Sequence, residues 1–123
     1  MAAPNLVTVT TITGKTTGAN LSTTSATTVL SNASSSGKLF KVNTLNVSNY
    51  GALASLVTVT WYNGANLTGT GFPIVGNVSV PAGTTLNVID KTSQYYIEEN
   101  QSIGATAGTA NLLVVTCSYE DVS

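Results

Sequence analysis

Few side chains in this sequence could take part in chemistry, and its acidic residues include two adjacent pairs. Glu98 and Glu99 lie in a polar stretch, and Glu120 and Asp121 lie close to the last residue of the sequence. General acid–base catalysis most often uses histidine, which the chain lacks, so these carboxylates are the remaining candidates. Neighbouring residues of a strand point to opposite faces, so neither pair is expected to meet on one substrate. We therefore expect solvated charges rather than a catalytic acid and base.

Cys117 is the only cysteine, which excludes a disulfide within the chain. A catalytic thiol is activated by a neighbouring base, and the chain has no histidine to serve as one. Zinc sites need clustered Cys and His, calcium sites need clustered carboxylates, and neither pattern occurs. We expect Cys117 to be a small buried side chain of the last strand, and we expect no metal, no cofactor and no enzymatic activity.

The chain is poor in charge of either sign. Charged residues make up 7% of its 123 residues, against about 25% in a typical domain, and the net charge is −1. Nucleic-acid binding depends on clustered Lys and Arg, which four scattered lysines do not provide. The sequence has no apolar run near the roughly 20 residues of a membrane helix, and its first residues do not resemble a signal peptide. We expect no nucleic-acid or membrane partner, and synthesis in the cytoplasm of the producing cell.

Thr and Val dominate the sequence, and both residues fit a pleated sheet better than a helix. Short apolar or alternating runs recur between Gly, Asn and Ser, which is typical of an all-β sandwich or barrel. We predict an antiparallel β-sandwich of jelly-roll-like type with an extended N-terminal arm. The runs predict strands over residues 5–13, 25–31, 38–49, 56–64, 72–80 and 84–90, a strand–turn–strand unit over 93–106, and a last strand over 110–121.

Alternation within the two longest runs predicts which side chains face the core. In the run 38–49, Phe40 and Val42 are expected on one face, and Leu39, Leu45 and Val47 on the other. Both faces of that strand would then be partly apolar, as in a strand with two packing surfaces. The last run is the most apolar, with Cys117 on its inner face, and it is expected to be a central strand.

The first 28 residues differ from the rest. Residues 13–28 contain almost no large apolar side chain, so we interpret 1–28 as an arm or linker and 29–123 as the sandwich domain. The alternating run "NLVTVTTI" predicts one exposed strand at the head of this arm. An exposed strand is a template for pairing with another chain. Its apolar residues are therefore candidate capsid or subunit contacts: Leu6, Val7, Val9 and Ile12.

Aromatic residues form two adjacent pairs, Trp61–Tyr62 and Tyr95–Tyr96. Aromatic rings on a sheet can stack on sugars, which gives a glycan-binding hypothesis. The alternative is a cross-strand or core role. Because adjacent strand residues alternate, one member of each pair should face inward and the other outward.

The order of strands and turns carries a resemblance. The segment "VLSNASSSGKLFKVNTLNVSN" is followed by "TVTWYNG", a Pro-Ala-Gly turn with a Thr-Leu strand, the polar turn of "EENQSIGAT" and the final "NLLVVTCSYED". This order resembles a β-sandwich found widely in structural proteins of tailed bacteriophages, over roughly Val29 to Asp121.

The resemblance implies a virion component without enzymatic activity. The short length favours a capsid decoration (cement) protein, made in the host cytoplasm, that binds the major capsid protein at the capsid surface and stabilises the head. Such proteins are often trimers, so the resemblance favours a homotrimer. The alternative is a receptor- or glycan-binding module of a head fibre, tail or neck.

Overall fold

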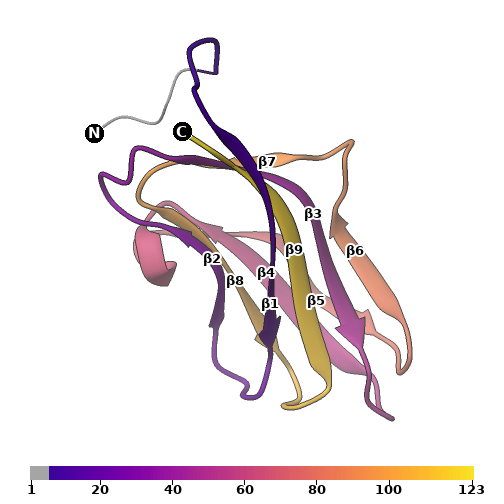
Figure 1. Cartoon of the computed structure of the whole chain (residues 1–123). Helices are drawn as coiled ribbons and strands as arrows, with labels where there is room; N and C mark the ends of the chain where they lie inside the picture. The colour runs from indigo at the N-terminus through magenta and orange to yellow at the C-terminus, as the bar shows by residue number, and fades with distance from the viewer. Residues whose placement is uncertain (1–5) are drawn as a thin grey trace.

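The computed structural model describes residues 6–123, which form nine strands and one short 3-10 helix in two antiparallel sheets packed face to face (Figure 1). The predicted antiparallel β-sandwich is therefore confirmed. The elements are β1 (Ile12–Asn20), β2 (Thr27–Asn32), β3 (Leu39–Asn49), β4 (Ser55–Tyr62), η1 (Ala65–Leu67), β5 (Gly71–Val80), β6 (Thr85–Ile89), β7 (Tyr95–Ile97), β8 (Gln101–Ala107) and β9 (Leu113–Val122).

The two sheets share the nine strands in a jelly-roll order. Sheet A has the order β1-β9-β3-β6, with β7 also paired to β3, and sheet B has the order β2-β8-β4-β5. Most chain connections therefore cross from one sheet to the other, which is the jelly-roll way of joining eight strands. The central position predicted for the last strand is confirmed, because β9 pairs with β1 on one side and with β3 on the other.

The core lies between the sheets and is built from alternate residues of the inner strands. On β9, Leu113, Val115 and Cys117 are fully buried, so the predicted inner face of that strand is confirmed. Alternation of this kind places every second side chain in the core and leaves the others toward solvent. The largest fully buried side chains are Leu21, Leu45, Ile89, Ile97, Ile103, Leu113, Val42, Val47, Val57, Val59, Val80 and Val115.

The prediction for β3 is right only for its first residues, because a bulge shifts the alternation: Phe40 and Val42 share the core face as predicted, but Leu45 and Val47 lie on that face too. Val42 lies opposite Tyr119 of β9 and Thr44 lies opposite Ser118, so Asn43 is an extra residue in the ladder. One inserted residue exchanges the faces of everything that follows it. Val42 and Leu45 are consequently both fully buried in the core. Leu39 is buried outside the core cluster, opposite Val122 of β9.

The strand expected near the N-terminus is displaced along the chain. Residue 5, where it was predicted to begin, lies outside the described residues, and residues 6–11 form no strand. The strand is β1, which pairs with β9 over its whole length. Alternation is a local signal, whereas a strand needs a hydrogen-bonded neighbour. The ladder with β9 starts at Ile12, and before it Thr10 and Thr11 form backbone bonds with Ser123. The expected linker over residues 13–28 therefore contributes β1 and the start of β2 to the sheets.

Two buried asparagines hold loops at opposite ends of the sandwich. At the end of β2, Asn32 donates from Nδ2 to the carbonyls of Lys38 and Ile97 at 2.9 and 3.1 Å. At the end of β3, Asn49 donates from Nδ2 to the carbonyls of Leu53 and Val80 at 2.8 and 2.9 Å. Each amide satisfies buried backbone groups of two separate segments, which ties the loops to the core.

Candidate interaction site at the charged end of the sandwich

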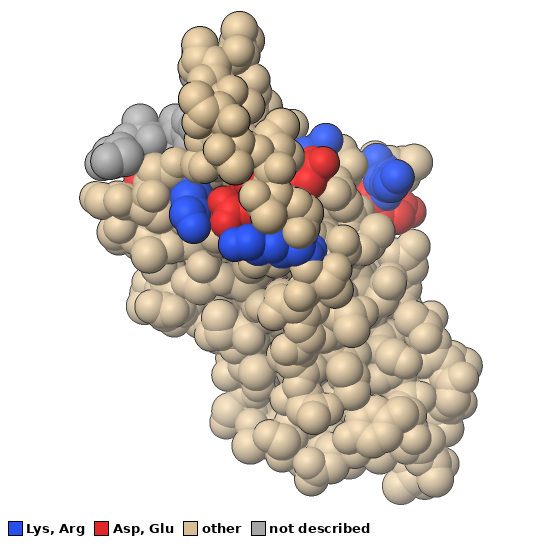
Figure 2. All heavy atoms as spheres, in the orientation of Figure 1, with Lys and Arg blue, Asp and Glu red and all other residues tan. Residues whose placement is uncertain are grey.

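All nine charged residues lie toward one end of the molecule. The sequence has no charged residue over 16–37, 42–89 or 100–119, and these ranges contain most of every long strand. The remaining positions fall near the start of β1 and β3, the end of β9, and the loops on either side of β7. Figure 2 shows the blue and red atoms gathered in the upper part of the view, with none visible over the lower part. We call this region the charged end.

Asp121 is the centre of a small ion-pair cluster at the charged end. Its Oδ2 accepts from Lys15 Nζ at 2.8 Å and lies 3.4 Å from Lys38 Nζ, and its side chain is only 7% exposed. Burial acts to raise the pKa of Asp121, but the hydrogen bond from Lys15 and the two lysine charges outweigh it, so the pKa lies below its ordinary value. The expectation of a solvated charge at this position is wrong.

Glu120 points away from Asp121, as the alternation of a strand requires. It lies opposite Lys41 of β3, and their charged atoms are 3.7 Å apart on the outer face of sheet A. The two adjacent carboxylates therefore serve different faces and do not meet, as predicted. The lysine partners depend on the register between β3, β9 and β1, which no local pattern reveals.

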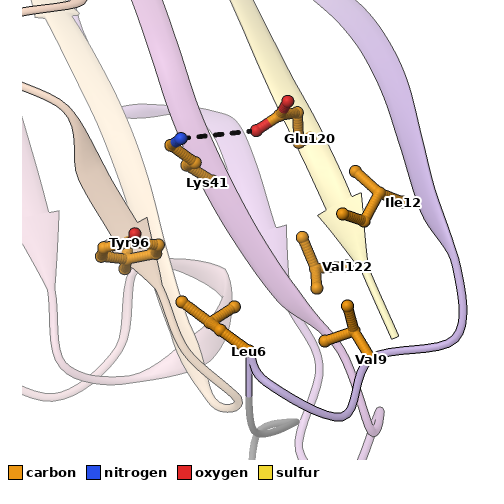
Figure 3. Close-up of a pocket in the computed structure, with 7 residues that line it drawn as sticks. All are labelled: Leu6, Val9, Ile12, Lys41, Tyr96, Glu120 and Val122. Carbon is orange, nitrogen blue, oxygen red and sulfur yellow. Dashed lines mark ion pairs between the residues drawn. The ribbon is translucent and has the colours of Figure 1, made fainter.

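Beside this outer ion pair lies a pocket of about 200 Å³ with a mainly apolar lining. Figure 3 shows its walls: the N-terminal segment and β1 on one side, β7 on the other, and β3 and β9 beneath. The lining residues are Leu6, Val9, Ile12, Lys41, Tyr96, Glu120 and Val122. Pairing explains the arrangement, because Ile12 lies opposite Val122 and Lys41 lies opposite Tyr96. Directly opposed residues in antiparallel strands share one face of the sheet.

Three of the four predicted contact residues meet at this pocket. Leu6, Val9 and Ile12 line it, whereas Val7 is 90% exposed and is not part of the lining. Leu6 and Ile12 keep 51% and 60% of their surface exposed. Burying half-exposed apolar side chains at the edge of a pocket under another surface is favourable, so these residues could stabilise a contact with a partner.

The four aromatic candidates do not form one platform. Trp61 and Tyr62 belong to β4 of sheet B, and Tyr95 and Tyr96 belong to β7 of sheet A. Trp61 and Tyr95 pack against the core, and each of their neighbours points to the outer face of its own sheet. The outer faces of a sandwich look in opposite directions, so Tyr62 and Tyr96 cannot stack on one small ligand.

Sequence reasoning missed Phe72 as the partner of Trp61. The two residues are opposed across β4 and β5, with ring centroids 5.4 Å apart, and Phe72 is 49% exposed. The only available signal was a second aromatic residue after the loop at residues 63–70, and reading it required the register of the hairpin. The pair is a cross-strand aromatic contact of the kind that stabilises sheets.

The acidic residues of the second half are mainly turn residues. Asp90 Oδ1 accepts from the backbone N–H of Thr92 at 2.8 Å and from its hydroxyl at 2.6 Å, and these hydrogen bonds lower the pKa of Asp90. Glu98 is exposed, as expected for a solvated charge. Glu99 is not solvated as expected: its Oε2 accepts from the N–H of Gly37 at 3.1 Å, and its Oε1 is buried.

Cys117 is completely buried, as predicted, and burial raises the pKa of its thiol to about 12. A thiol in this state is not a nucleophile at neutral pH. Within residues 6–123, no cluster of three or more His, Cys, Asp or Glu side chains is placed to hold a metal ion. Over the same residues no helix is long and apolar enough to cross a membrane.

Comparisons with known proteins give a structural likeness, which concerns the fold alone. No protein-family model matches the sequence, and no curated protein matches it. A chain from the structure of Bacillus endospore appendages, which form a family of disulfide-linked pili, superposes with a TM-score of 0.50 at 14% identity. The match covers 91% of this chain and 87% of that chain. This likeness supports the β-sandwich fold alone.

Proposed function

We propose that this protein is a non-enzymatic structural component of a phage particle, specifically a capsid decoration protein that binds the major capsid protein and stabilises the head. The observation that carries the proposal is the pocket at the charged end, where Leu6, Val9 and Ile12 present apolar surface beside Tyr96. This is the segment in which the sequence predicts a contact with another chain. The capsid resemblance of the sequence supplies the identity of the partner.

Contact through this face would be individually weak and collectively strong. Leu6 and Ile12 are each about half exposed, so covering each of them stabilises the complex by roughly 1 kcal/mol. A lattice offers many identical sites, and contacts of this size add up when copies or modules are linked. The charges nearby already have partners within the chain, so binding should depend weakly on ionic strength.

The sharpest test replaces one apolar contact by a charge. Leu6→Asp should abolish co-sedimentation with phage heads stripped of this protein, because it places an unpaired carboxylate in the apolar contact. Leu53→Asp is the matched control: Leu53 is 68% exposed and lies in the β3–β4 loop at the opposite end, so this variant should bind like the wild type. Equal binding by the two variants would refute the proposed face.

A truncation provides an independent check. Removing residues 1–10 takes away Leu6 and Val9 but leaves β1 paired with β9, so the sandwich should remain folded. The truncated protein should keep its far-ultraviolet circular dichroism spectrum and fail to bind heads. Full binding by the truncated chain at both low and high salt would contradict the proposal.

The alternative function is glycan binding by a head-fibre, tail or neck module. Its remaining support is the half-exposed Phe72 beside Trp61, since the four predicted aromatic residues are divided between two sheets. A glycan array with the wild type and with Phe72→Ala tests it. A signal that disappears in the variant would favour this alternative over capsid decoration.

A further inference from the structure

The edges of the two sheets differ in how well they are protected against pairing with another chain. An exposed edge strand carries unpaired backbone N–H and C=O groups, and proteins usually blunt such edges with short strands, bulges or proline. Within residues 6–123, the edges are β1 and the β6–β7 side of sheet A, and β2 and β5 of sheet B. Three of these four edges carry such protection.

The far edge of sheet A is divided between β6, with five residues and a register shift, and β7, with three residues. β2 has six residues and a shift between Thr28 and Leu30. β5 contains Pro73, two register shifts against β4 and a left-handed residue, Asn77, with φ of 49°. None of these strands offers a long regular ladder.

β1 has none of these interruptions. Its nine residues pair with β9 in one unbroken register, from Ile12 opposite Val122 to Asn20 opposite Val114. The same register continues beyond both of its ends, where Thr11 bonds with Ser123 and the N–H of Leu21 with the carbonyl of Leu113. β1 contains no proline and no residue with positive φ.

The ladder also shows which backbone groups face outward. In an antiparallel strand the N–H and C=O of one residue point to the same side, and the side alternates from residue to residue. Thr11 and Leu21 both direct their N–H and C=O groups to the β9 side, so the odd-numbered residues between them do the same. The groups directed away from β9 therefore belong to Ile12, Gly14, Thr16, Gly18 and Asn20.

Lys15 is the one charged residue of β1, and a lysine on an edge strand disfavours pairing with the strand of another chain. Its ammonium group is instead held by Asp121 at 2.8 Å, and Asp121 is nearly buried. The rest of β1 is uncharged, with Gly, Thr, Ala and Asn after Lys15. Neither charge nor shape therefore prevents a second strand from lying along this edge.

We propose that β1 pairs antiparallel with β1 of a second copy of this chain, about a two-fold axis at Thr16, so that the two A sheets become one continuous sheet. Full overlap places Ile12 opposite the partner's Asn20, Gly14 opposite the partner's Gly18, and Thr16 opposite the partner's Thr16. In this register, each residue whose N–H and C=O point away from β9 lies opposite a residue of the same kind in the second copy. All ten backbone groups of these five residues can then form hydrogen bonds between the copies.

The occupant is a second β1 because no other edge of a second copy matches it. A contact between two different edges would have to use β2, β5 or the β6–β7 side, all of which are blunted. A contact of one edge with itself is isologous and closes as a dimer. The trimer that the capsid resemblance implies would need a heterologous contact, so the edge geometry favours a two-fold pair instead. This inference does not depend on the proposed capsid partner.

Cysteine cross-linking of the full chain tests both the pairing and its register. Thr16→Cys places one thiol opposite its copy, with the Cα atoms about 5.5 Å apart, which is within the range a disulfide spans. Thr13→Cys is the matched control, an exposed threonine of the same strand that lies about 20 Å from its copy across six residues of offset. Cys117 is buried and does not compete.

We expect the Thr16→Cys chain to form a covalent dimer under mild oxidation, and the Thr13→Cys chain to remain monomeric under the same conditions. Sedimentation should show a concentration-dependent dimer for the wild type. Thr16→Pro should weaken this dimer about 30-fold, because one hydrogen bond from each copy is lost while pairing with β9 is kept.

Two results would overturn the pairing. One is a wild-type chain that sediments as a monomer throughout. The other is a dimer in which Thr16→Cys cross-links no faster than Thr13→Cys, since the copies would then meet through another surface. Thermal unfolding of the cysteine variants at the wild-type temperature is the check that they fold. Binding to phage heads is measured separately, because neither result bears on the proposed capsid contact.

Discussion

Replacing Asn49 by Ala should cost more stability than any other single polar truncation at the uncharged end. Asn49 is 1% exposed at the end of β3, and its side chain makes three hydrogen bonds. Nδ2 donates to the carbonyls of Leu53 and Val80, and Oδ1 accepts from the N–H of Gly51 at 2.9 Å. Alanine removes all three and leaves the buried carbonyl of Val80 and the part-buried backbone groups of Leu53 and Gly51 without these partners.

The size of the effect follows from the number of these bonds. A buried hydrogen bond contributes about 1 kcal/mol net, so the Asn49→Ala variant should lose about 3 kcal/mol of unfolding free energy. For a chain of this size that loss lowers the melting temperature by roughly 10 °C. Asn49→Asp should be at least as destabilising at neutral pH, because the carboxylate keeps the acceptor but loses both donated bonds and carries a buried charge.

Urea unfolding followed by tryptophan fluorescence measures the loss, with an unchanged dependence on urea as evidence that the folded state is intact. Asn46→Ala is the matched control, because Asn46 lies on the same strand and makes no side-chain hydrogen bond within residues 6–123. It should change the unfolding free energy by less than about 0.5 kcal/mol. If Asn49→Ala lost no more than this control, the three hydrogen bonds would not hold the loop as we argue.

Three further outcomes are expected. Leu45→Ala should cost about 2–5 kcal/mol in the same urea experiment, because the bulge places Leu45 in the core; a loss typical of surface positions would contradict that register. Cys117 should resist alkylation at neutral pH in the folded protein and react only after unfolding, so rapid labelling would contradict its burial. Asp121→Asn should lower stability at neutral pH. In the folded protein the pKa of Asp121 lies below its ordinary value of 3.8, so the extra stability of the wild type is fully present above pH 3.8 and is lost as the pH falls through the folded pKa. The unfolding free energies of the wild type and the variant should therefore converge in acid. A difference that stayed constant down to acidic pH would exclude this linkage.

Part of the candidate interaction site is predictable from the sequence. Apolar alternation predicts Leu6, Val9 and Ile12 as contact residues, and all three line the pocket. The same alternation predicts an exposed strand there, whereas residues 6–11 do not form one. The sequence suggests glycan binding for Tyr96, predicts a solvated charge at Glu120 and assigns no role to Lys41, because the partner of each depends on pairing between distant strands.

The sequence by itself determined the fold class, the position of most strands and turns, the inner face of β9 and the burial of Cys117. These follow from side-chain period, β-branched content and turn residues, which act over a few neighbouring positions. Only the tertiary structure decided which strands became neighbours and in what register. That choice placed the bulge at Asn43, moved the first strand to β1, brought three lysines to Glu120 and Asp121, and separated the aromatic pairs onto opposite sheets. The physical reason is that one residue of shift in a ladder exchanges the two faces of a strand, so side-chain neighbours are set by long-range hydrogen bonding rather than by local composition.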